Sequence, residues 1–351
     1  MMRSEKSFRI IPFILLYSFT HLVVDATCAF LLLGVLDIHD HVILSLILYN
    51  FIAFVLQAPF GFLIDKGLNP KLAAIAGLIF ITSAFIFGNY LFVPLILVSI
   101  GNALFHVGGG SLVLALEEKK ASFSGIYVAP GGIGLAIGSF LAFAPFSTSL
   151  LLFPGLAIVL SIILYFIRVP EFKRVKECNR KKISFCYIAL VITLISIPII
   201  IRSLIGLSVS FPWKDNQLLY ASLVFAIALG KAFGGILSDK LGLAAVGVGG
   251  LLLSMPLLAF CTEIPALGVL GAFIFNFTMP ATLIAILNII PEKRGLAFGL
   301  STTALFIGSL PVILGNTEWL SSSYVVFSLI LLAAIILLTA FYLTKKTRNG
   351  V

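Results

Sequence analysis

Two ionisable side chains lie four residues apart inside the first long apolar run of the chain. His21 and Asp25 are spaced to share one face of a helix, where they can interact directly. Ionisable groups in an apolar span are costly, which makes them candidates for function. An imidazole beside a carboxylate could bind and release a proton near neutral pH. The alternative is a static pair that ties this helix to a neighbour.

A second histidine, His106, lies near the middle of the fourth apolar run. Three glycines follow it, Gly108, Gly109 and Gly110. Glycines remove side-chain bulk beside the imidazole, which leaves room for a ligand or for a closely packed helix. His106 is therefore a candidate for a site role or a packing group whose hydrogen bonds are satisfied.

Two cations also lie within apolar runs. Lys231 could neutralise an anionic substrate, pair with Asp25 or extend its ammonium toward the interface. Arg202 could line a cavity or extend toward the outer interface. The full set of candidates for proton coupling or substrate binding is Asp25, His21, His106, Lys231, Arg202, Asn276 and Gln57.

The elements that must position these side chains are membrane-spanning helices. The 351 residues are 60% hydrophobic and only 11% charged, with a mean hydropathy of +1.18. Soluble domains carry about 25% charged residues, so lipid must cover most of this chain. The apolar runs are about 20 residues long, which fits helices and excludes the short alternating strands of a barrel.

Twelve apolar segments are bounded by charges or turn residues, which predicts an all-α membrane protein with twelve transmembrane helices. They span approximately 10–36, 42–64, 71–89, 92–116, 122–146, 148–167, 184–209, 216–238, 242–261, 265–289, 295–315 and 321–344. The cut between the fifth and sixth, at 147–149, carries no charge. The N-terminal run is too long for a signal-peptide core, so we expect it to be retained.

The basic residues predict the orientation. Twenty of the 23 Lys and Arg fall on alternate loops and on both termini, whereas the opposite loops hold only Lys214. Cytoplasmic loops are rich in Lys and Arg, so we expect a multi-pass protein of the cell membrane with cytoplasmic N- and C-termini. Trp213 and Trp319 lie at the outer boundary. The net charge of +9 is then a topology signal, and we expect no nucleic-acid partner.

The two halves of the chain resemble each other. The longest connection, 168–183, is basic and separates a predicted six-helix bundle at 1–167 from a second at 184–351. A loop motif recurs at an offset of 174, and two helix motifs recur at 170, namely 101–106 with 271–276 and 135–139 with 305–309. The loop positions are Gly61, Asp65 and Lys66 in the first copy and Gly235, Asp239 and Lys240 in the second. At the 170 offset Asn276 matches His106, and at 174 Lys231 matches Gln57.

The loop motif resembles the signature of the major facilitator superfamily, a Gly with an Asp four residues later and a basic residue after it. The match is partial, because Asn69-Pro70-Lys71 stands where the family has a basic pair. This resemblance implies two pseudo-symmetric six-helix bundles, and it implies a gating role for the motif, chiefly for Asp65 and secondarily for Asp239. An Asp at a helix end can face the positive N-terminus of a neighbouring helix.

The fifth run, 122–146, loosely resembles the Gly-Pro motif of drug–proton antiporters, with plain tight packing as the alternative. The expected function is a secondary active transporter that moves a small solute by alternating access, with proton coupling. A drug/proton efflux antiporter is the alternative, ahead of a transport-inactive sensor or a membrane-embedded enzyme. No phosphate-binding loop is present, and the four cysteines lack metal-site spacing. We therefore expect no enzyme activity, cofactor or metal, and a monomer.

Overall fold

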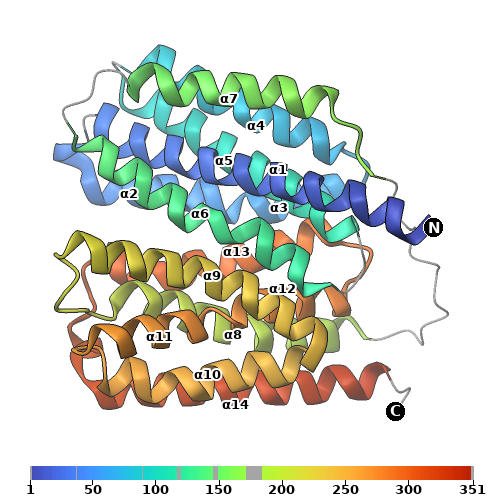
Figure 1. The fold of residues 1–351 in the computed structure, drawn as a ribbon, viewed down its shortest axis with the longest axis vertical. Coiled ribbons are helices and arrows are strands. Elements are labelled where there is room, and N and C mark those ends of the chain that lie inside the picture. The colour runs from blue at the N-terminus through green and yellow to red at the C-terminus, as the bar shows by residue number, and fades with distance from the viewer. Residues whose placement is uncertain are drawn as a thin grey trace. The chain divides into compact units, whose positions relative to one another are not determined.

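The computed structural model describes residues 2–36, 38–88, 90–116, 120–144, 149–170 and 184–348, and within these ranges the chain is helical with no strand (Figure 1). Eleven helices are long and apolar enough to cross a membrane by length and composition, and α7 (Ser149–Phe166) is a shorter apolar helix. The predicted all-α, multi-pass membrane protein is thus confirmed.

The helices follow the predicted segments to within a few residues. Those before the basic connection are α1 (Met2–Phe30), η1 (Leu31–Val35), η2 (His39–His41), α2 (Val42–Asn50), η3 (Phe51–Val55), α3 (Gln57–Asp65), α4 (Pro70–Ala84), η4 (Phe85–Phe87), α5 (Phe92–Leu116), α6 (Ala121–Ala142) and α7. Those after it are α8 (Phe185–Ser208), α9 (Gln217–Leu241), α10 (Leu243–Phe260), α11 (Pro265–Phe275), α12 (Thr278–Ile289), α13 (Arg294–Ile313), η5 (Glu318–Ser321) and α14 (Ser323–Arg348).

Two predicted features fall partly outside the described residues. In the cut at 147–149, positions 147 and 148 lie outside the described residues, and in the connection at 168–183, positions 171–183 do. The fifth helix ends at Ala142, four residues before its predicted end.

The chain forms two compact units. Unit 1 comprises Met1–Glu118, Ile126–Lys173 and Arg294–Thr303, and unit 2 comprises Lys119–Gly125, Arg174–Lys293 and Ala304–Val351. Each unit therefore holds most of one sequence half together with the beginning of a helix, α13 or α6, that belongs to the other half. The domain bounds predicted from the sequence, 1–167 and 184–351, stay a prediction.

Within unit 1, α4 packs on α5 and α7. The closest approach of α4 and α5 is glycine on glycine. A Cβ added to Gly77 would lie 2.5 Å from the carbonyl oxygen of Gly101, and one added to Gly101 would lie 2.6 Å from the oxygen of Gly77. Small residues allow such close backbone contact between membrane helices, where packing replaces the hydrophobic effect as the driving force.

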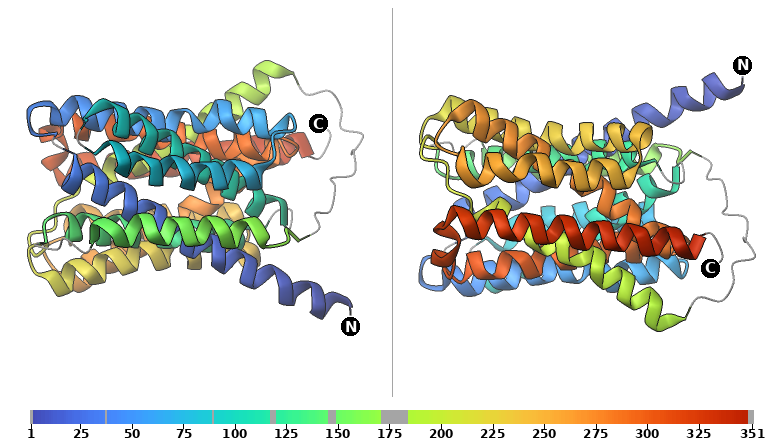
Figure 2. Two further views of the ribbon diagram at one scale, coloured as in Figure 1. Left: turned by 90° about the horizontal axis from the view of Figure 1, so that it is seen from above. Right: turned by 90° about the horizontal axis from the view of Figure 1, so that it is seen from below.

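Within unit 2, α14 runs along α8 and α10 (Figure 2). Their shared core is hydrophobic and includes Ile205, Leu251, Ile330 and Leu337, all of which are almost fully buried. This apolar packing holds the three helices of unit 2 together.

The internal repeat is visible in the packing of both halves. A Cβ on Gly138 of α6 would collide with the carbonyl of Ala26 on α1, and one on Gly308 of α13 would collide with the carbonyl of Ile200 on α8. The fifth helix of each half therefore touches the first helix of the same half through an equivalent glycine. This agrees with the predicted pseudo-symmetric bundles.

The glycine pair between α4 and α5 gives a direct test of this packing. Gly77→Ala should destabilise the protein by about 1–3 kcal/mol, because the methyl group would overlap the backbone of α5. Gly155→Ala in α7 is the matched control, since a Cβ there meets nothing within 4 Å. Thermal unfolding in detergent should show a lower melting temperature for Gly77→Ala alone; equal melting temperatures would contradict the described contact.

Candidate functional site

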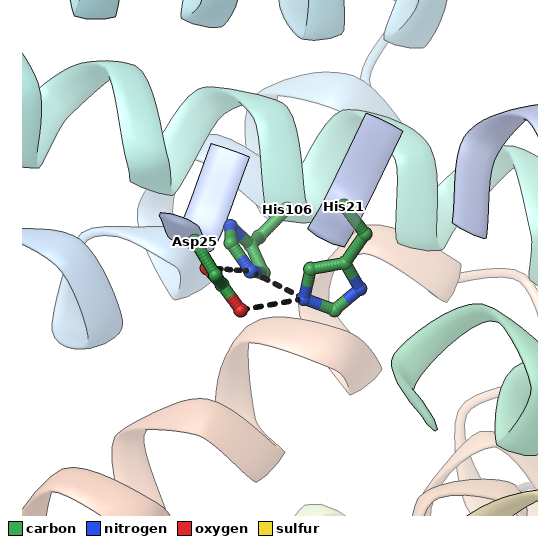
Figure 3. Close-up of side chains that lie close together, drawn as sticks. All are labelled: His21, Asp25 and His106. Carbon is green, nitrogen blue, oxygen red and sulfur yellow. Dashed lines mark hydrogen bonds and ion pairs between the residues drawn. The ribbon is translucent and has the colours of Figure 1, made fainter. Parts of the chain in front are cut away.

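His21, Asp25 and His106 converge on one point inside unit 1 (Figure 3). The Nε2 atoms of the two imidazoles are 2.8 Å apart. The carboxylate of Asp25 lies 3.2 Å from Nε2 of His21 and 3.3 Å from Nε2 of His106. We call these three residues the triad. His21 and Asp25 contact each other from successive turns of α1, as expected from their spacing, and α5 supplies His106.

The outer nitrogen of each imidazole is held by the backbone. Nδ1 of His21 lies 2.9 Å from the carbonyl oxygen of Tyr127 on α6, and Nδ1 of His106 lies 2.9 Å from the carbonyl oxygen of Asn102. A carbonyl oxygen can only accept a hydrogen bond, so each Nδ1 carries the proton and donates it. These two bonds fix the ring orientation and direct both Nε2 atoms inward.

This arrangement gathers acceptor atoms. With Nδ1 protonated, a neutral imidazole offers only a lone pair at Nε2, and an ionised carboxylate offers only acceptor oxygens. Two lone pairs at 2.8 Å repel unless a proton lies between them. A proton shared by the two Nε2 atoms, or another cation bound by both, would relieve this repulsion beside Asp25.

A polar shell around the triad was not predicted. The side-chain amide of Asn102 donates toward Asp25 at 3.5 Å, toward the thiol of Cys28 at 3.5 Å and toward the hydroxyl of Tyr49 at 3.2 Å. Asn102 precedes His106 by four residues and Cys28 follows Asp25 by three. Helical spacing from the predicted candidates was thus the available signal for both.

The glycines of α6 face α1 and the triad. A Cβ on Gly131 would lie 2.5 Å from Oδ2 of Asp25 and 2.6 Å from Nε2 of His21. Gly134 meets the carbonyl of Leu22 in the same way. Close packing, the simpler interpretation of this glycine-rich helix, accounts for Gly134. Gly131, in contrast, places no side chain against Asp25 and His21.

The three glycines after His106 are used for packing. Gly108 lies against the backbone of α4, Gly109 against the ring and hydroxyl of Tyr127, and Gly110 against the ring of Phe298 on α13. The space that they leave is thus filled by neighbouring residues of α4, α6 and α13.

The repeated loop motif forms two equivalent clamps. The carboxylate of Asp65 accepts hydrogen bonds from the N–H groups of Gly295 (2.9 Å) and Leu296 (2.8 Å), at the start of α13. The carboxylate of Asp239 accepts from Ala121 (2.7 Å) and Ser122 (3.2 Å), at the start of α6. Helix N-termini expose unpaired N–H groups and positive dipole ends, so each carboxylate satisfies both.

Glycines permit these clamps. A Cβ on Gly61 would overlap the backbone of Gly295, and one on Gly235 would lie 2.5 Å from the carbonyl oxygen of Ala121. The basic residues of the motif lie elsewhere: the ammonium of Lys66 is 4.6 Å from the ring centroid of Phe62, and Lys240 lies in the last turn of α9.

The residues that depart from the family motif have structural roles. The side chain of Asn69 caps α4 by accepting from the N–H of Lys71 at 2.9 Å, and Pro70 occupies the first helical position. The ammonium of Lys71 donates to the carbonyls of Tyr165 (2.7 Å) and Ile167 (2.8 Å), at the end of α7.

The remaining candidates lie on other helices than the triad. Gln57 is buried at the start of α3, where its amide donates to the carbonyl of Ala53 at 2.7 Å. Asn276 lies at the break between α11 and α12 and donates to the carbonyl of Ala272 at 2.9 Å. Lys231 and Arg202 belong to α9 and α8 of unit 2. Among the described residues, Nε of Arg202 is buried without a hydrogen-bond partner.

No protein-family model matches the chain, and no curated protein matches its sequence. Solved structures do match. A fucose:proton symporter of E. coli aligns with a TM-score of 0.68 and 15% identity over 97% of this chain and 99% of that one. The human organic anion transporter MFSD10 aligns at 0.65 and 14% over 96% and 99%. A bacterial homolog of the human lysosomal transporter Spinster aligns at 0.57 and 13% over 97% and 98%.

The E. coli symporter, also solved in an outward conformation, is a major facilitator superfamily transporter. The chain is thus similar over nearly its whole length to transporters of that superfamily. The resemblance predicted from the loop motif is confirmed at the level of the fold.

The tautomers of the triad can be tested directly. Nitrogen NMR of protein labelled with ¹⁵N-histidine should show Nδ1 protonated in both His21 and His106, because each faces a backbone carbonyl. His21→Asn should leave Nδ1 of His106 protonated, since its partner is Asn102 in its own helix. An Nε2–H tautomer with a bare Nδ1 in either ring would refute the described orientation.

Proposed function

We propose that this chain, which has the major facilitator fold, is a secondary active transporter that moves a small solute by alternating access. The observation that carries the proposal is the triad, a buried centre of two imidazoles and a carboxylate inside apolar helices. Ionisable groups at membrane depth are rare and mark ion or substrate pathways. The protein acts as a monomer in the cell membrane, with both termini cytoplasmic.

Transport is coupled to a proton held by the triad. The positive charge shared by His21 and His106 lies beside Asp25, whose side chain keeps 20% of its surface exposed, so the centre is not sealed. Losing the proton leaves the two Nε2 lone pairs opposed and breaks the contact between α1 and α5. A match to a fucose:proton symporter in fold supports this coupling without identifying the solute.

Helix α6 links the triad to a clamp. The carbonyl of Tyr127 holds the ring of His21, and the N–H groups of Ala121 and Ser122 are held by Asp239. Tyr127 follows Ala121 by six positions of continuous helix, about 9 Å along the axis. A change of charge at the triad therefore bears on the helix whose beginning Asp239 fixes.

The two clamps are the gating elements. Each joins a helix of one sequence half to the start of a helix of the other, through hydrogen bonds between an ionised carboxylate and backbone N–H groups. Such bonds are worth about 1.5–3 kcal/mol each, enough to favour one conformation yet weak enough to release. The drug/proton antiporter is not specifically favoured, because Gly134 and Gly138 of α6 are occupied by packing on α1.

Solute flux tests the carrier. A thermal-shift screen across metabolite and drug classes selects stabilising compounds, and their uptake is then measured in proteoliposomes under an imposed pH gradient. Asp25→Asn should abolish gradient-driven uptake, since it removes the anion that balances the shared proton, whereas Asp215→Asn at an exposed position should leave it unchanged. A protonophore should act like Asp25→Asn on the wild-type protein. If well-folded protein moves none of the panel, the carrier proposal fails.

The gating role has its own test. Spin labels at Leu68 and Glu292, both exposed, report distances by electron paramagnetic resonance in a background without native cysteines. The amide oxygen of Asn can still accept one bond, so Asp65→Asn should remove about 1.5–3 kcal/mol of clamp energy and shift the population toward longer distances by a factor of about 10–100 in the equilibrium constant. Asp40→Asn, at an exposed site, is the control. A distance distribution that ignores Asp65→Asn would show that the contact is structural only.

A further inference from the structure

We propose that His21, Asp25 and His106 form a binding site for a divalent first-row transition-metal ion, for which Zn²⁺ is the probe. This inference goes beyond the proposed carrier function and does not depend on it. Among the described residues, the ligand-capable atoms of these three side chains all lie within 4.8 Å of one another.

The donor set selects the class of ion. Two imidazole nitrogens and one carboxylate oxygen suit zinc, iron, cobalt, nickel or manganese, whereas calcium and magnesium prefer oxygen ligands throughout. Three protein ligands with a further open position are also the pattern of zinc and iron sites that exchange a ligand or water. Asp25 contributes the negative charge that such an ion requires.

The separations of the donor atoms fit one small ion. Ligands at about 2.1 Å from a common metal lie about 3.0 Å apart on a facial octahedron and about 3.4 Å apart on a tetrahedron. The three contacts of the triad are 2.8, 3.2 and 3.3 Å. Movements of a few tenths of an ångström would therefore complete the coordination.

The outer contacts are those of metal-binding histidines. Such a histidine donates its other ring N–H to a carbonyl or carboxylate, which fixes the tautomer and aims the lone pair at the metal. His21 does this through the carbonyl of Tyr127, and His106 through that of Asn102. The two rings meet edge to face, with centroids 4.4 Å apart, and the ring of Tyr127 packs on His21 at 4.9 Å.

A proton satisfies the triad only in part. One proton placed between the two Nε2 atoms leaves the carboxylate at 3.2 and 3.3 Å, longer than charge-assisted hydrogen bonds of about 2.7–2.9 Å. A divalent ion bound to all three acceptors would satisfy every lone pair at once. The metal ion would then take the place of the shared proton.

Gly131 lies against the donor atoms of Asp25 and His21 and, having no side chain, does not displace them. Any side chain at this position would come within 2.5 Å of Oδ2 of Asp25 and 2.6 Å of Nε2 of His21. Gly131→Ala therefore perturbs the site without removing a ligand, which makes it a test that does not depend on losing a charged group.

The experiment is Zn²⁺ titration of the purified full-length protein in detergent at pH 7.5, by isothermal calorimetry, with Mg²⁺ as the counter-probe. One Zn²⁺ should bind per chain, and Mg²⁺ should not compete. Asp25→Asn and His106→Gln should each raise the Kd by about 100-fold or more, and Gly131→Ala by about 10-fold. His41→Gln and Cys186→Ser, both at exposed positions, should leave the Kd unchanged.

Size-exclusion profiles and melting temperatures establish that each variant is folded. X-ray absorption of the zinc complex should show nitrogen and oxygen ligands at about 2.0–2.1 Å with an imidazole signature. The proposal is overturned if folded wild-type protein binds no Zn²⁺, if Asp25→Asn and His106→Gln bind it as tightly as wild type, or if sulfur is found in the coordination shell. Solute flux without Zn²⁺ binding would contradict the metal site and leave the carrier proposal standing. Zn²⁺ binding without solute flux would contradict the carrier proposal and leave the metal site standing.

Discussion

The convergence of two imidazole nitrogens and a carboxylate inside apolar helices is the constraint on which the account of this molecule depends. Both imidazoles of the triad have their outer N–H facing backbone carbonyls, so their inner nitrogens and the Asp25 carboxylate bring three acceptors together, which a shared proton or another cation would satisfy. In a membrane such a centre is expensive unless its charges balance. Three helices, α1, α5 and α6, contribute to it, so the proposed change of its charge would act on the contacts among them.

The two clamps hold the N-terminal ends of α13 and α6. Asp65 and Asp239 are related by the offset of 174, and so are the N–H groups that they accept from, at 295–296 and 121–122. The symmetry is thus one of interactions as well as of sequence. Glycines at 61 and 235 keep both clamps short by letting the backbones meet.

Helix number, approximate bounds and the repeat were predictable because they follow from hydropathy, loop charge and recurring motifs. His21 and Asp25 were found by their spacing of four on one helix. The partnership with His106 was not predictable, because it depends on how α1 and α5 are aligned, which no local pattern encodes. Asn102 was missed although its spacing of four from His106 pointed to it. The contact of Gly131 with the triad was not predictable, because it depends on a backbone approach seen only in three dimensions.

The central claim is that the triad at rest holds an ionised Asp25 beside an imidazolium. Infrared difference spectroscopy between wild type and Asp25→Asn in lipid nanodiscs at neutral pH tests it most directly. The account predicts the loss of an ionised carboxylate band together with a change in the imidazolium bands of His21 and His106. Loss of a protonated carboxylic acid band, with both histidines neutral, would contradict it.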